Sequence, residues 1–177
     1  MGKSNLKKIF IEFGKNLTPE FSIDKSLNKI DMYAIHRRVS AERWEYIALF
    51  VSKYQNEIFM EVAISPHDSF PGNTIPGEPD EIRKSGIIRF RANRLWTKKN
   101  SFGWLIEKKP DAKLVIAGFE DISLNPIDLA AKYKAPINNE GIYESYEEAF
   151  ENMKRKIKEW VLPYFDKMTS AHVSHNK

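Results

Sequence analysis

Apolar residues recur at helical spacing near the two ends of the chain and at strand spacing between them. Near the start they lie three or four residues apart, at Leu6, Ile9, Phe10, Phe13 and Leu17. This spacing predicts a helix over about residues 5–17, because apolar residues at these intervals share one helical face and Pro19 follows as a stop signal.

A longer series near the end predicts the strongest helix of the chain. Its members again step by three or four residues: Tyr146, Phe150, Met153, Ile157, Trp160 and Tyr164. Such a series lays one apolar stripe along a helix. Ser145 and Glu148 have the spacing of a capping box, which predicts where the helix begins. Pro163 removes one backbone hydrogen bond and is expected to bend or end the helix near Leu162.

Between the helices, three segments rich in apolar and β-branched residues predict strands, at residues 29–40, 44–54 and 57–65. Their connections are of hairpin length, so the strands are expected to pair as an antiparallel meander. In the middle segment both alternating sets of residues are apolar, which predicts a central strand covered on both faces. A fourth, half-buried strand is expected over residues 86–96, where apolar and polar residues alternate.

The fold class predicted from these elements is α+β: an antiparallel meander sheet of four or more strands, flanked by an N-terminal helix and a long C-terminal helix. Substantial burial is expected for a set of large side chains: Trp44, Phe50, Met60, Phe90, Phe150, Ile157 and Trp160. A short strand is expected around residues 104–106. Asn125 and Pro126 predict the start of a short helix over residues 126–134, whereas residues 114–122 show no periodicity that decides their form.

Composition bounds the class of protein. The 177 residues are 42% hydrophobic, which suits a single domain over residues 1–169, followed by a flexible tail over residues 170–177. The absence of cysteine excludes disulfides and thiolate metal ligands. No apolar stretch approaches the ~18 residues of a membrane span. We therefore expect a cytoplasmic protein that does not enter a membrane.

Charge argues against a dedicated nucleic-acid binder. The 28 basic and 24 acidic side chains are mostly interleaved and leave a net charge of +4, whereas such binders concentrate positive charge in a patch or stripe. The sequence also holds no cysteine nucleophile, no Gly-x-Ser-x-Gly elbow, no phosphate-binding glycine loop and no His-Glu-x-x-His motif. This weakens an enzymatic interpretation without deciding it, and we assign no catalytic residue and no cofactor.

The segment "SPHDSFPGNTIPGEPDE", residues 65–81, is the first candidate site. A loop this long and this rich in proline and glycine is typically functional or mobile. His67 and Asp68, together with the acids near its end, have the donor atoms of a divalent metal site. Their spacing is not that of a known ligand set, so acids that keep the loop solvated are the favoured interpretation and no metal is expected. The acid–lysine pairs near residues 107–113 match a metal nuclease only loosely.

Arginines on the fourth strand are the second candidate. The binding residues that we assign are Arg38, Arg89, Arg91, Arg94 and Trp96, with His67 and Asp68 from the loop. A guanidinium group pairs bidentately with carboxylate or phosphate, and an indole ring stacks on it, which together predict an anion-binding face. We expect the loop acids to border this face and to neutralise its arginines in the free protein. The blander alternative, which we favour, is that the arginines form salt bridges with Glu45, Glu61 or the loop acids.

The order of motifs also carries a resemblance. The strand "WEYIALF", the strand "EVAIS", the proline–glycine loop, "RFRANRLW", a "GW" pair and the helix end "VLPYFDKM" follow one another between residues 44 and 168. In this order the chain resembles small bacterial domain-of-unknown-function proteins. The resemblance implies a binding or immunity-like role and no catalytic residue.

The sequence therefore supports two functional hypotheses. The first is a non-enzymatic protein-interaction domain with a protein partner. The alternative is a protein that acts on phosphate or nucleic acid through an arginine-rich sheet face. The sequence does not indicate an oligomeric state.

Overall fold

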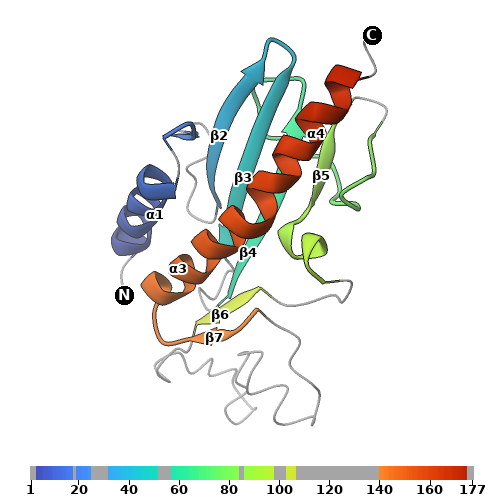
Figure 1. Cartoon of the computed structure of the whole chain (residues 1–177). Helices are drawn as coiled ribbons and strands as arrows, with labels where there is room; N and C mark the ends of the chain where they lie inside the picture. The colour runs from blue at the N-terminus through green and yellow to red at the C-terminus, as the bar shows by residue number, and fades with distance from the viewer. Residues whose placement is uncertain are drawn as a thin grey trace, which may run out of the picture.

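The computed structural model of the chain describes residues 3–17, 19–24, 32–51, 57–83, 86–97, 103–106 and 140–174. Within them a seven-stranded sheet is covered on one face by helices (Figure 1). These helices are α1 (Lys3–Leu17), α3 (Tyr146–Lys156) and α4 (Leu162–Ser174). The predicted α+β class, with a mostly antiparallel meander, an N-terminal helix and a long C-terminal helix, is confirmed. No helix of the described part is long and apolar enough to cross a membrane.

Three long strands form the predicted meander: β2 (Met32–Ser40), β3 (Arg43–Val51) and β4 (Glu57–Ser65). Each pairs antiparallel with the next along the chain. The short strand β1 (Ser22–Ile23) adds to the outer edge of β2. The sheet therefore grows from a continuous antiparallel centre, as the hairpin-length connections predict.

The free edge of β4 is shared by two strands. Strand β5 (Ile88–Arg91) pairs with its second half and β6 (Trp104–Ile106) with its start, both antiparallel. Strand β7 (Ile142–Tyr143) then pairs parallel with β6. The predicted fourth strand is shorter than expected, because residues 92–95 form a turn of 3₁₀ helix, η1 (Ala92–Leu95). The predictions for residues 114–122 and 126–134 lie outside the described residues.

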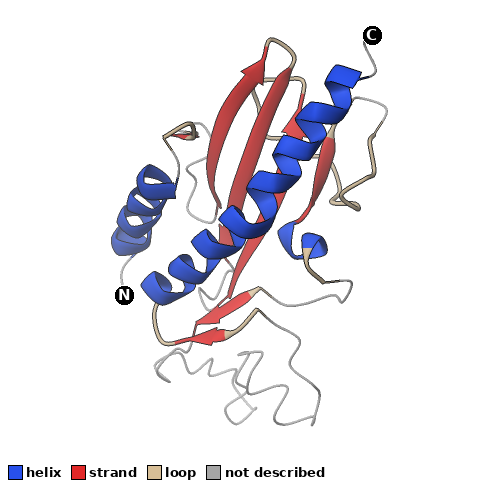
Figure 2. Ribbon diagram, viewed as in Figure 1, coloured by secondary structure: helices blue, strands red, loops and turns tan. Residues whose placement is uncertain are grey.

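The alternating residues of β3 pack into two different cores, so the prediction of a strand covered on both faces is confirmed. Ile47 and Leu49 belong to the larger core, which lies under the helices. Tyr46 and Ala48 belong to a smaller core on the opposite face, which includes Phe70 of the proline–glycine loop. We call the side under the helices the helix face and the opposite side the far face. Figure 2 shows the helices gathered on one side of the strands.

Aromatic contacts join the helices to the larger core. The ring of Phe10 on α1 lies 4.7 Å from that of Tyr33 on β2, measured between centroids. The ring of Phe13, also on α1, lies 5.2 Å from that of Phe150 on α3. At the start of α3, the Ser145 hydroxyl accepts a hydrogen bond from the Glu148 backbone N–H, as the capping-box spacing predicts. Capping and packing thus agree on where the C-terminal helix begins.

A π-helical turn, η2 (Ile157–Val161), separates α3 from α4 and corrects the predicted apolar stripe. Such a turn carries one residue more than an α-helical turn, so the residues after it rotate out of the earlier register. Val161 and Phe165 consequently reach the core, whereas the Trp160 side chain is 38% exposed. The burial predicted for Trp160 is wrong for this reason. Pro163 does not end the helix, which continues through α4 to Ser174.

Candidate functional site

The proline–glycine loop lies on the far face of the sheet. Its Phe70 side chain is buried and meets the Tyr46 ring edge-on, at 5.9 Å between centroids. The Tyr46 hydroxyl donates a hydrogen bond of 3.1 Å to the His67 carbonyl. Burial, with the nearby charges of Asp68 and Asp24, raises the pKa of Tyr46 above its ordinary value, so this hydroxyl stays a donor. The first half of the loop therefore completes the smaller core.

The second half of the loop reaches round the sheet edge to the helices. The Tyr164 hydroxyl of α4 donates a 2.7 Å hydrogen bond to the Pro79 carbonyl. Gly77 forms a parallel bridge with Phe90 of β5, and its N–H donates to the Arg89 carbonyl at 2.7 Å. These contacts cover the outer edge of β5, an edge that would otherwise offer unpaired backbone groups.

The side chain of Arg89, on β5, lies beneath the loop and is not part of an exposed surface. Its side chain is only 8% exposed, and it forms a salt bridge of 2.7 Å with Glu61 on β4. Its Nη1 group donates to three loop carbonyls, those of Pro71, Gly72 and Thr74, at 3.0, 2.8 and 2.5 Å. Burying a guanidinium requires this degree of hydrogen bonding. The prediction of a half-buried strand is therefore wrong at Arg89, which lies buried under the loop.

The acids at the end of the loop do not neutralise Arg89 or Arg91, contrary to expectation. Glu78 instead lies 3.5 Å from Arg94, and Glu81 lies 2.9 Å from Arg83. Glu61 contacts both strand arginines, because it stands directly opposite Arg91 in the β4–β5 register. No group of three His, Asp or Glu side chains in the described part is arranged to hold a metal ion.

Two of the assigned arginines remain accessible on the far face, and each lies over an aromatic ring. The Arg38 guanidinium is 5.6 Å from the centre of the Trp44 ring, and that of Arg91 is 4.2 Å from the centre of the Phe59 ring. Arg38 is exposed, the Arg91 side chain is 43% exposed, and both rings are partly buried. We call these four residues the arginine–aromatic face; its two pairs lie toward opposite ends of the far face, with Phe70 of the loop packed against Tyr46 and Phe50 between them.

Trp96 does not join this face. It packs against the helix-side core, with its ring 6.4 Å from that of Trp104, and its Nε1 donates to Glu140 at 2.9 Å. The Lys156 ammonium group lies 4.9 Å from the Trp96 ring centre. Trp96 lies six residues after Phe90, whose side chain is in the same core, so the period-two alternation of a continuous strand would also have placed it on the helix face, opposite Arg89 and Arg91.

His67 and Asp68 lie exposed at the start of the loop. Asp68 faces His36, whose Nδ1 atom lies 3.9 Å from a carboxylate oxygen of Asp68 and 3.9 Å from one of Asp24. The His36 ring also contacts the rings of Trp44 and Tyr46. A histidine beside two carboxylates was not predicted, because Asp24 and Asp68 come from segments that only the fold brings together.

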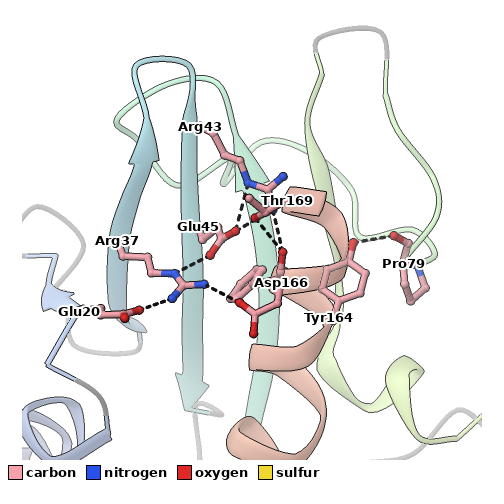
Figure 3. A network of polar contacts seen from close by, with 9 residues as sticks. Glu20, Arg37, Arg43, Glu45, Pro79, Tyr164, Asp166 and Thr169 are labelled. Atoms are coloured by element: carbon pink, nitrogen blue, oxygen red, sulfur yellow. Dashed lines mark hydrogen bonds and ion pairs between the residues drawn. The ribbon is translucent and has the colours of Figure 1, made fainter. Parts of the chain in front are cut away.

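A second charged cluster lies on the helix face, at the end of the sheet where β2 turns into β3. Arg37 and Arg43 both contact Glu45, whose side chain is fully buried (Figure 3). A groove of about 450 Å³ opens over this cluster. The pairing of Arg37 with Glu45 follows from the hairpin register, which places the two residues opposite each other.

Another buried acid lies at the start of β4, where Glu57 pairs with Leu105 of β6. Glu57 accepts a 2.9 Å hydrogen bond from the Gly103 backbone N–H. Burial raises the pKa of the Glu57 carboxyl, and this effect outweighs the hydrogen bond from Gly103 and the attraction of Arg91, which lower it. A cavity of about 10 Å³ beside it, lined in part by Phe59, Arg91 and Trp104, is too small for an organic ligand.

These observations define the chain as an α+β domain whose far face carries ordered arginines and whose proline–glycine loop is part of the fold. No family model, no curated protein and no solved structure matches it.

Proposed function

We propose that the protein is a non-enzymatic protein-interaction domain that docks its partner on the arginine–aromatic face. The observation that carries this proposal is the pairing of two accessible guanidinium groups with aromatic rings, Arg38 with Trp44 and Arg91 with Phe59. Arginine and tryptophan are enriched among the residues that dominate interface energies. A guanidinium group already held over a ring loses less side-chain freedom when it binds.

A protein partner fits the charges of this face better than nucleic acid does. Glu61 lies 3.5 Å from Arg91, and Arg89, the third arginine of the far face, is already neutralised and buried. A polyanion gains affinity by releasing counterions from many phosphates, which needs a concentration of unpaired positive charge. A surface of mixed sign instead favours a protein that offers acidic and apolar groups in a matching pattern. A cytoplasmic location, which is expected from the sequence, and the immunity-like role that the resemblance implies belong to the same proposal.

The test is a comparison of two double variants with equal changes in charge. Arg38→Ala with Arg91→Ala alters the arginine–aromatic face, whereas Arg155→Ala with Lys158→Ala removes two exposed cations from the C-terminal helix. A partner captured by the wild-type protein is identified, purified and titrated against all three forms. Loss of one strong interface anchor corresponds to ≥ 2 kcal/mol, so the first variant is expected to bind more than about tenfold more weakly. The second is expected to bind like the wild type.

Equal affinities of the two variants would contradict the proposal. Binding of single-stranded oligonucleotides that weakens steeply with added salt, and that Arg38→Ala with Arg91→Ala abolishes, would favour the alternative of a phosphate- or nucleic-acid-acting protein. Circular dichroism and urea unfolding of both variants serve as the control that the fold is retained.

A further inference from the structure

The groove over the cluster on the helix face has the features of a ligand site. It is lined by six residues: Glu20, Arg37, Arg38, Val39, Asp166 and Thr169. They come from the segment before β1, from the end of β2 and from α4. A volume of about 450 Å³ lies within the range of small-molecule sites in proteins, roughly 300 to 1,000 Å³. Figure 3 shows Arg37 between Glu20 on one side and Asp166 on the other.

Arg37 is held rigidly at the base of this groove. Its guanidinium carbon lies 5.1 Å from the centre of the Phe21 ring and 5.8 Å from that of Phe165. Its Nε atom donates a 2.7 Å hydrogen bond to Glu45, which is fully buried. Rings and carboxylate fix the inner part of the side chain and leave the outer edge, Nη1 and Nη2, for other partners. A planar fork fixed in this way is pre-organised for an anion.

The buried part of the cluster carries excess positive charge. Arg43 is 8% exposed, and its Nη2 atom donates to Glu45 at 2.7 Å and to the Phe165 carbonyl at 3.3 Å. Its Nη1 atom is buried and has no hydrogen-bond partner in the described part of the chain. Two guanidinium groups, those of Arg37 and Arg43, thus share the single buried carboxylate of Glu45, which leaves a charge of +1.

Only exposed carboxylates balance this charge. Nη1 of Arg37 contacts Glu20, and its Nη2 lies 3.6 Å from Asp166. The side chains of Glu20 and Asp166 are 64% and 75% exposed. Burial alone would lower the pKa of Arg37, but Glu45 and Glu20 together raise it above its ordinary value, so the guanidinium stays charged. Exposed ion pairs contribute little to stability, so another anion can replace Glu20 and Asp166 at low cost.

We propose that this groove binds a ligand carboxylate, which takes the outer edge of Arg37 in place of Glu20 and Asp166. A carboxylate matches the fork with two parallel N–H···O bonds. Its single negative charge balances the excess charge of +1 on the cluster of Arg37, Arg43 and Glu45. A phosphate, with a charge of about −1.5 to −2 near neutral pH, would carry more negative charge than the cluster balances. It would also be repelled by the nearby carboxylates of Glu20 and Asp166. The proposed contact is made by Arg37 on the helix face, and Arg38 is the one residue of the groove lining that also belongs to the arginine–aromatic face.

The test uses a variant that removes the competing side chains. Glu20→Gln with Asp166→Asn is compared with the wild type and with a control, Glu144→Gln with Glu147→Gln, which removes one exposed acid just before α3 and one in its first turn. Each is titrated with benzoate, with an N-acetylated tripeptide that has a free C-terminus, with the C-terminal amide of that tripeptide, and with inorganic phosphate. Binding is followed by NMR through the Nε–Hε signal of Arg37 and the backbone signals of residues 37–39 and 166–169.

We expect carboxylates to shift these signals and Glu20→Gln with Asp166→Asn to bind about tenfold more tightly than the wild type, a difference of 1.4 kcal/mol. The control variant should match the wild type, and the amide should not bind. Tighter binding of the tripeptide than of benzoate identifies a peptide C-terminus as the source of the carboxylate, and the reverse identifies a small organic acid.

Three results would overturn the proposal. One is that carboxylates leave the signals of Arg37 and its neighbours unchanged in the variant without Glu20 and Asp166. Another is an equal gain in affinity in the control variant, which would mean a general effect of net charge. The third is inorganic phosphate binding as tightly as the carboxylates, because the fork would then not select the charge of its ligand.

Discussion

Replacing Arg89 by methionine tests whether the proline–glycine loop is held to the sheet by one buried arginine. The substitution keeps an unbranched side chain of similar length and removes the guanidinium group. It breaks the 2.7 Å contact with Glu61 and removes the donor from the carbonyls of Pro71, Gly72 and Thr74. The guanidinium also lies 5.0 Å from the centre of the Phe70 ring, the aromatic anchor of the loop.

The expected loss of stability follows from burial. The side chains of Arg89 and Glu61 are 8% and 6% exposed, and removal of one partner from a buried pair costs about 3 to 5 kcal/mol. Arg91 remains 3.5 Å from Glu61 and partly compensates its charge, which favours the lower value. The loop carbonyls lose hydrogen bonds worth about 1 kcal/mol each when water does not replace them. We expect a total loss of about 3 to 6 kcal/mol, depending on how many of the three carbonyls are reached by water.

Urea unfolding near neutral pH measures this loss, and Arg83→Met is the matched control. Arg83 follows the loop by two residues, and its pair with Glu81 is exposed, so its removal is expected to cost about 1 kcal/mol or less. The loss of stability for Arg89→Lys should fall between those of the other two variants, because lysine keeps the positive charge but lacks the several N–H donors of the planar guanidinium group. Limited proteolysis should cut residues 66–83 faster in Arg89→Met. A loss for Arg89→Met no larger than that for Arg83→Met would refute the role given to Arg89.

Three further changes test other parts of the fold by urea unfolding. Trp160→Ala is expected to cost less than about 1 kcal/mol, because this side chain is 38% exposed. Phe165→Ala should cost about 3 to 5 kcal/mol. A larger loss of stability for Trp160→Ala than for Phe165→Ala would contradict the position of the π-helical turn. Gly103→Ala should cost more than about 2 kcal/mol, since its Cβ would lie 1.8 Å from the Ile58 carbonyl oxygen, and a neutral result would exclude this close approach. The raised pKa of Glu57 means that its stabilising contribution is present below the ordinary value of 4.5 and is lost as the pH rises through the folded-state pKa. The stability of the wild type relative to Glu57→Gln should therefore increase as the pH is lowered from about 7, and a constant difference would contradict the shift.

The local elements were predictable because their signals are local. The meander follows from three apolar segments with hairpin-length connections, and the structure has the expected strands β2, β3 and β4. The capping interaction between Ser145 and Glu148 follows from a spacing of three residues. Both depend on residues near one another in the chain, so no knowledge of tertiary packing is needed to find them.

The burial of individual side chains was harder to predict. A π-helical turn has no simple sequence pattern, and one inserted residue is enough to exchange Trp160 for Val161 in the core. The position of Arg89 depends on a loop that folds back over its own strand. An arginine that alternates with apolar residues has the pattern of a solvated strand face, and only the contacts with Glu61 and the loop carbonyls show that it is buried.

Arg89, which is buried, and Arg37, which is partly buried, differ in what surrounds their outer edges, and this difference separates a structural role from a binding role. Both Arg89 and Arg37 contact a buried carboxylate and lie against aromatic rings. Nη1 of Arg89 is occupied by backbone carbonyls, which belong to the fold and cannot leave without unfolding the loop. The outer atoms of Arg37 contact only exposed carboxylates among the described residues, and rotation about side-chain bonds is enough to release them. A ligand can therefore compete for Arg37 in the folded protein, whereas competition for Arg89 requires the loop to open.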